Sequence, residues 1–186
     1  MRNMKRVLPF VLVAAIVIAT ALGASLLKPN KVQVPKKSAE LAEQLVKACD
    51  LLSVEDAKTV LGQDIEPADG SDAAAASSDD IAVSRCVFAQ KLGAAVTPAS
   101  QKQASLVVRS PRSDTGKQAN RNVFTGSAKP ANVEQVSGFG ESAFWNPEFG
   151  QLNILKNDAW YIVEAGPSVP TERKAEDAKT LARTVL

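Results

Sequence analysis

Histidine is absent from this 186-residue chain. The chain therefore cannot form Ser-His-Asp or Cys-His catalytic sets, and it lacks both the commonest general base and the side chain on which most zinc sites depend. Cysteine is scarce as well, because Cys49 and Cys86 are the only two and they do not form a Cys-x-x-Cys motif. The sequence predicts no catalytic residues of these classes, no metal site and no cofactor.

An excess of charge of one sign is missing too. The formal net charge is +2, from 22 basic and 20 acidic residues, and three of the basic residues are clustered at Arg2, Lys5 and Arg6. The rest of the chain is therefore nearly neutral, and it contains no helix rich in Lys and Arg that could follow a phosphate backbone. Nucleic-acid binding is not predicted.

One long apolar run is present near the start of the chain. Residues 7–27 carry no charge, and roughly 20 apolar residues at ~1.5 Å rise per residue span a ~30 Å hydrocarbon core. The basic residues in 1–6 favour a cytoplasmic flank. The sequence thus predicts a single-pass helix in the cell membrane, with the C-terminal part outside the cytoplasm. Ala21 and Gly23 also fit a cleaved signal sequence, which would leave a secreted protein.

Beyond this run the chain has room for one domain. Residues 28–37 are rich in Lys and Pro and are predicted to be a linker, and residues 38–186 suffice for one extracytoplasmic domain with its own core. The stretch Asp69–Asp80 has no large apolar residue and is predicted to be a loop. Its acidic residues lack the spacing of an EF-hand calcium site.

The cysteine pair has a direct interpretation in an exported domain. An oxidising compartment favours disulfides, so we predict a bond between Cys49 and Cys86. It would close a loop that contains the acidic stretch, and its role would be structural.

Local patterns predict an α+β fold. Ser53 begins a capping box, Ser113 can cap a further helix, and Pro170-Thr171 opens the last one. The predicted helices cover about 39–48, 53–62, a segment after 113, and 170–185, and the predicted strands cover 81–89, 105–110, 142–145, 151–155 and 160–165. Turn signals at Asn146-Pro147 and Asn157-Asp158 make the last three strands a meander. We expect an antiparallel sheet of about four or five strands packed by helices.

Several of these pieces occur together in one known group. The opening Cys49-Asp50-Leu51-Leu52-Ser53, the second cysteine Cys86 in a strand, and the Gly138-Phe139-Gly140 turn before a strand resemble the small envelope lipoproteins of unknown function found in actinobacteria. The resemblance implies an extracytoplasmic α+β domain with a disulfide and no assigned chemistry. No cysteine closely follows the apolar run, which favours an anchor made of protein over a lipid.

Carboxylates are the remaining candidates for catalysis. Two suitably spaced acids suffice for glycoside hydrolysis, and Glu141, Glu148 and Glu164 lie near the predicted meander. The alternative is that all three are solvated charges of strands and turns.

Aromatic residues form only 5% of the chain, yet six of them lie between residues 139 and 161. Neighbouring residues of a strand face opposite ways, so in Phe144-Trp145 and in Trp160-Tyr161 one member must point outward or lie under a helix. One interpretation is that both sheet faces are partly covered. The other is an exposed aromatic patch that binds an envelope protein, a glycan or a lipid. The candidate binding residues are Phe139, Trp145, Trp160 and Tyr161.

These patterns favour a non-catalytic binding or interaction module of the cell envelope. The alternative is a carrier of a small apolar ligand held between sheet and helices, and a carboxylate-based hydrolase comes third. An exposed aromatic patch would favour the module, an aliphatic cavity the carrier, and two converging buried carboxylates the enzyme.

Overall fold

A computed structural model describes residues 46–69, 71, 77–98 and 100–186 of this protein. Contacts divide the chain into units 1–33 and 34–186, and all described residues belong to the second unit. The predicted flank 1–6, membrane or signal segment 7–27 and linker 28–37 lie outside the described residues, as do most of the predicted helix 39–48 and the centre of the acidic stretch. Within the described ranges, every helix is too short or too polar to span a bilayer.

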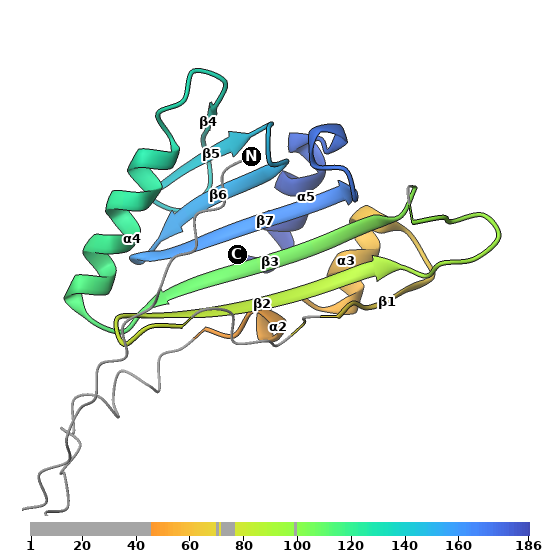
Figure 1. Ribbon diagram of the computed structural model, residues 1–186, viewed down its shortest axis with the longest axis horizontal. Helices are drawn as coiled ribbons and strands as arrows, with labels where there is room; N and C mark the ends of the chain where they lie inside the picture. The colour runs from red at the N-terminus through yellow and green to blue at the C-terminus, as the bar shows by residue number, and fades with distance from the viewer. Residues whose placement is uncertain (1–45, 70, 72–76, 99) are drawn as a thin grey trace, which may run out of the picture. The chain divides into compact units, whose positions relative to one another are not determined.

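The described residues form an α+β fold around one antiparallel sheet of seven strands, in the order β1-β2-β3-β7-β6-β5-β4 (Figure 1). The strands are β1 (Ile65–Pro67), β2 (Ile81–Gln90), β3 (Lys102–Pro111), β4 (Glu134–Val136), β5 (Ser142–Asn146), β6 (Gln151–Lys156) and β7 (Ala159–Pro167). The predicted α+β class is confirmed, but the predicted count of four or five strands is wrong. The two missed strands, β1 and β4, form the outer edges, and each has three residues that are mostly exposed, which is too short to show an alternating pattern.

Two of the helices begin at a serine side-chain cap. They are α2 (Ala48–Leu51), α3 (Val54–Leu61), α4 (Asp114–Ser127), the 3₁₀ turn η1 (Pro170–Glu172) and α5 (Ala175–Val185). Ser53 makes the predicted capping box with Asp56 before α3, and the Ser113 hydroxyl accepts from the Gly116 N–H at 3.0 Å before α4. Pro170 opens only the 3₁₀ turn, and the last α-helix starts five residues later.

In the described part of the chain, one long connection crosses the sheet. After β3 it passes through α4 to the far edge at β4, and then returns through the meander β4-β5-β6-β7, so that β7 pairs with β3 in the middle. The β6–β7 hairpin turns at Asn157 and Asp158, whose φ values of 51° and 63° are those of a type I′ turn. The predicted meander is thereby confirmed.

Both faces of the sheet are covered. On one face α2, α3 and α5 pack against alternate strand residues, and this main core includes Leu52, Leu61, Leu106, Val163 and Leu181. On the other face α4 lies across one end of the sheet (Figure 1), where its Phe124 packs against residues of β5, β6 and β7. A helix on each face explains why the central strands contain few charged residues.

The predicted disulfide is confirmed. It joins Cys49 of α2 to Cys86 of β2, with 5.0 Å between their Cα atoms. Cys86 is fully buried in the main core, so the bond fastens α2 to the sheet beneath it.

Candidate functional site

Three of the four aromatic residues predicted to bind a ligand or partner are buried. Trp145 and Tyr161 belong to the main core and are 4% and 8% exposed, while Trp160 lies on the opposite face under α4 and is 7% exposed. Burial raises the pKa of Tyr161, because the phenolate would lose solvation. The arrangement agrees with two covered sheet faces, and it leaves Phe139 as the candidate that a ligand can reach.

Trp160 has its polar edge satisfied inside the domain. Its indole N–H donates to the Asn153 side-chain oxygen at 3.0 Å, and the Arg109 guanidinium lies 5.2 Å above its ring. The Phe124 ring meets it edge-on, with 6.1 Å between ring centroids. These contacts give Trp160 a packing role.

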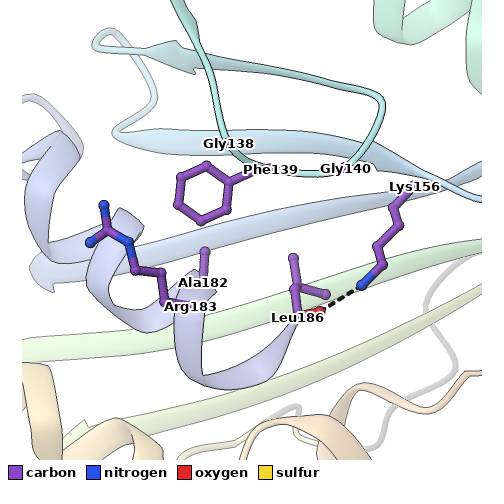
Figure 2. A pocket seen from close by; sticks show the side chains of 7 residues that line it. All are labelled: Gly138, Phe139, Gly140, Lys156, Ala182, Arg183 and Leu186. Carbon is purple, nitrogen blue, oxygen red and sulfur yellow. Dashed lines mark hydrogen bonds between the residues drawn. The ribbon is translucent and has the colours of Figure 1, made fainter.

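Phe139 lies in the loop between β4 and β5 and is half-buried against the main core. The Arg183 guanidinium of α5 stacks over its ring, 5.6 Å from the centroid. Figure 2 shows Phe139 and Arg183 side by side, with Lys156 near the end of α5. Two hollows, of about 350 and 370 Å³, share Phe139 and Arg183. We call this pair of hollows the Phe139 groove.

The walls of the Phe139 groove come from three elements. The first hollow is lined by Gly138, Phe139, Gly140, Lys156, Ala182, Arg183 and Leu186, and the second by Glu134, Gln135, Val136, Ser137, Phe139, Glu176, Lys179 and Arg183. One wall is thus β4 with its following loop, the other is α5, and Lys156 at the end of β6 contributes to the first hollow.

The backbone conformation of the loop at 138–140 requires its two glycines. Gly138 and Gly140 have φ values of 87° and 53°, which strain residues with a Cβ atom. A Cβ atom on Gly140 would also lie 2.3 Å from the main-chain oxygen of Leu155. The next residue, Glu141, donates its N–H to that same oxygen at 2.8 Å, so the loop is fastened directly to β6.

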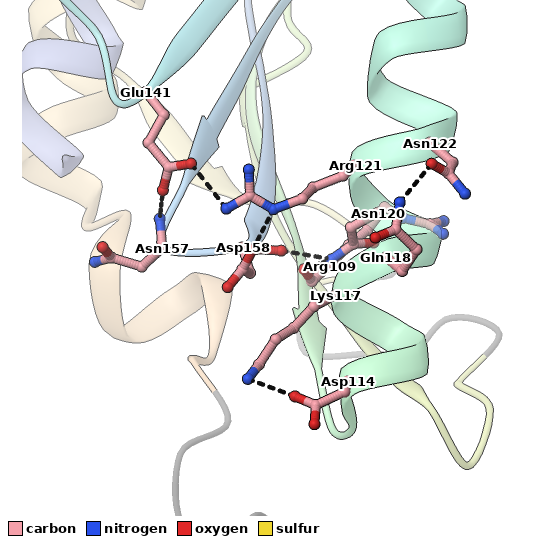
Figure 3. A network of polar contacts seen from close by, with 10 residues as sticks. All are labelled: Arg109, Asp114, Lys117, Gln118, Asn120, Arg121, Asn122, Glu141, Asn157 and Asp158. Carbon is pink, nitrogen blue, oxygen red and sulfur yellow. Dashed lines mark hydrogen bonds and ion pairs between the residues drawn. The ribbon is translucent and has the colours of Figure 1, made fainter.

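An ion network on the other side fastens the same loop to α4 (Figure 3). Arg121 of α4 pairs with Glu141 at 3.1 Å and with Asp158 at 2.5 Å. The second oxygen of Glu141 accepts from the Asn157 N–H at 2.8 Å. The hydrogen bond from Arg121 to Asp158 is the main cause of the raised pKa of Arg121. This network holds the start of β5, and with it the loop that carries Phe139.

The Phe139 groove has more cationic than acidic side chains. Its cations are Lys156, Lys179 and Arg183, and its acids are Glu134 and Glu176. Lys179 pairs with Glu176 at 2.7 Å, and this hydrogen bond lowers the pKa of Glu176. Lys156 donates one hydrogen bond to the main-chain oxygen of Leu186. Arg183 makes no hydrogen bond or ion pair within the described part of the chain, so its guanidinium donors are available to a ligand.

The three candidate carboxylates do not converge. Glu164 accepts from Ser105 and Gln151 and pairs with Arg173 at 3.0 Å. Glu141 is held at the opposite end of β6, beside Asn157, and Glu148 is exposed in the β5–β6 turn. Glu141 and Glu164 therefore do not form the facing pair that glycoside hydrolysis requires. Within the described ranges, no group of three or more His, Cys, Asp or Glu residues could hold a metal ion.

Sequence reasoning found Phe139 but missed the residues around it. Glu176, Lys179 and Arg183 recur at helical spacing along one side of the last helix, so their shared face could have been read from the sequence. That this face adjoins the loop at 138–140 depends on the crossing of the chain to β4, which no local pattern indicates.

Comparisons of this chain with protein-family models, with curated proteins and with solved structures found no match. The resemblance to actinobacterial envelope lipoproteins therefore stays a prediction, and the functional argument depends on the geometry of the Phe139 groove.

Proposed function

We propose that this protein is a non-catalytic binding module of the cell envelope, held at the membrane by residues 7–27 with its C-terminal domain outside the cytoplasm, and that the Phe139 groove is its binding site. The observation that carries the proposal is the Arg183 guanidinium, which lies on a half-buried aromatic ring at the junction of two hollows. It makes no hydrogen bond or close ion pair among the described residues, and it interacts with Glu176 only through a longer-range electrostatic attraction.

Arginine and aromatic residues supply most of the binding energy at many protein interfaces, because both present a large flat surface with few rotatable bonds. Stacking on Phe139 orients the guanidinium without using its hydrogen-bond donors. A ligand that reaches Arg183 therefore meets a pre-oriented cation, and less conformational entropy is lost on binding.

The alternative functions gain less support from this geometry. A carrier of a small apolar ligand needs an aliphatic cavity, whereas the second hollow of the Phe139 groove is lined largely by polar and charged residues and the first contains the cations Lys156 and Arg183. A hydrolase needs converging carboxylates, and Glu141 and Glu164 lie at opposite ends of β6.

Site-specific photo-crosslinking in cells of the source organism tests the proposal. A photoreactive residue replaces Ser137, which is exposed in the groove, or Thr115, which is exposed on α4 away from it. We expect a defined adduct in the membrane fraction from position 137 and none from position 115, and we expect Arg183→Gln to remove it. Equal adducts at both positions, or none, would contradict a binding role for the groove, and an adduct confined to the soluble fraction would contradict the anchor.

A further inference from the structure

The Phe139 loop offers backbone donors as well as a cation. The N–H groups of Gly138, Phe139 and Gly140 make no hydrogen bond within the described part of the chain. The sign of φ alternates along these residues, since both glycines are positive and Phe139 is not. Successive N–H groups in an αR-αL or turn conformation can converge on one point and form a concave site for an anion. The backbone donors of this loop thus suit a carboxylate or a phosphate.

Side chains around the loop reinforce this preference. Arg183 and Lys156 line the same hollow of about 350 Å³ as the three loop residues. An ammonium has three donors, and Lys156 gives one of them to Leu186. Arg183 retains its donors for a planar oxyanion, which a guanidinium can bind through two parallel hydrogen bonds.

The second hollow runs along the free edge of the sheet. Among the residues that the structure describes, β4 is the outermost strand and pairs only with β5. Four consecutive residues, Glu134 to Ser137, line this hollow. Successive residues of a strand point to opposite faces, and the hollow touches all three residues of β4 as well as Ser137 after it. This is the lining expected of a hollow that follows the edge of the strand. The opposite wall is α5, through Glu176, Lys179 and Arg183.

An unpaired strand edge beside a helix is suited to an added strand, because the main chain of an extended peptide can satisfy the free edge groups. Building on the proposed function, we propose that the Phe139 groove binds an extended peptide, which adds to the free edge of β4 and places a carboxylate on the amides of Gly138–Gly140 and on Arg183. The carboxylate comes from the C-terminus of the peptide or from an acidic side chain. A C-terminal carboxylate requires the peptide to run parallel to β4, because the loop follows the end of that strand.

Nuclear magnetic resonance titration of the isotope-labelled full chain in detergent micelles tests this inference. The probes are an acetylated Val-Thr-Val-Thr-Val peptide with a free C-terminus, its C-terminal amide, and the amide with Glu as the last residue. We expect the free acid to shift the amide signals of Gly138–Gly140 and to bind at least about tenfold more tightly than the plain amide, since charge-assisted hydrogen bonds are lost on amidation.

The third probe separates the two sources of the carboxylate. Tight binding of the Glu-bearing amide assigns the site to an acidic side chain, and tight binding of the free acid alone assigns it to a peptide C-terminus. If neither the free acid nor the Glu-bearing amide binds more tightly than the plain amide, the inference is overturned. Displacement of the free acid by inorganic phosphate at concentrations below that of the peptide would overturn the assignment to a peptide.

Arginine variants provide the matched comparison. Arg183→Gln should remove the preference for acid over amide, whereas Arg85→Gln, at an exposed position of β2, should retain it. If the wild type and Arg183→Gln prefer the free acid over the amide to the same extent, the inference is contradicted. The two proposals can fail separately. Crosslinking at position 137 without any preference for the free acid would support the binding module and contradict only the proposal of a peptide carboxylate.

Discussion

At the scale of single residues, the two tryptophans are buried on opposite faces of the sheet and have separate neighbours. Trp145 packs with the main core, and Trp160 with Phe124 under α4. The alternation of a strand correctly placed neighbouring aromatics on opposite faces. The sequence could not show that a helix covers the second face, because that cover depends on Phe124 meeting strands far away in the chain. Hence Phe139, in a loop, is the aromatic candidate left within reach.

We therefore expect Trp145→Ala and Trp160→Ala each to lower the free energy of unfolding by about 3–5 kcal/mol, the usual effect of deleting a buried aromatic side chain. Denaturant unfolding of the two single variants measures this. Phe149→Ala is the control, because Phe149 is 52% exposed, and it should change stability by less than ~0.5 kcal/mol. A small loss at Trp160 would mean that α4 does not cover the second face.

At the scale of elements, α4 contains two glycines whose surroundings differ. A Cβ atom on Gly116 would lie 2.0 Å from the main-chain oxygen of Asp80, whereas one on Gly126 would meet no described atom within 4 Å beyond its chain neighbours and the backbone of its own helix. Gly116 is thus the point where α4 touches the segment before β2. Helix propensity alone favours alanine at both positions.

The two substitutions should accordingly act in opposite directions. We expect Gly126→Ala, in the last turn of α4, to stabilise the protein by at most about 0.5–1 kcal/mol, the value for a helix interior, and Gly116→Ala to destabilise it by about 1–3 kcal/mol through overpacking. Thermal and denaturant unfolding of both variants would show this. Stabilisation by both would indicate that α4 is not packed against Asp80.

The elements that could be predicted from the sequence are those with a capping or turn residue at one end. Ser53, Ser113 and the Asn157-Asp158 turn mark their helices and hairpin because each local interaction involves residues a few positions apart. β4 has no such mark, because it becomes a strand only by pairing with β5. β4, the strand that lines the Phe139 groove, could therefore not be predicted from local sequence patterns.

At the scale of the whole molecule, the disulfide joins α2 to β2 across a sequence separation of 37 residues. The chain-entropy model gives roughly 3–4 kcal/mol for closing a loop of this length in the unfolded state. The Cys49→Ser, Cys86→Ser double variant should lose about that much stability, and its melting temperature should fall by several degrees.

Calorimetry of the double variant, and of wild type with and without reductant, measures the loss. Reduced wild type should behave like the variant, and the untreated protein should contain no free thiol. Two free thiols in protein isolated without reductant would contradict the bond. The pairing was predictable because there are only two cysteines, whereas the order of the strands was not, because it depends on the crossing from β3 to β4.

The central position of β7 has a consequence for the chain during its synthesis. β3 emerges from the ribosome early, but its second neighbour is made only after α4 and the whole of β4, β5 and β6. Until then one edge of β3 is unpaired, and this ten-residue strand, with Leu106, Val107 and Val108 at its centre, could pair with another copy. This edge of β3 is therefore covered only once the chain through residue 167 is available to pair with it.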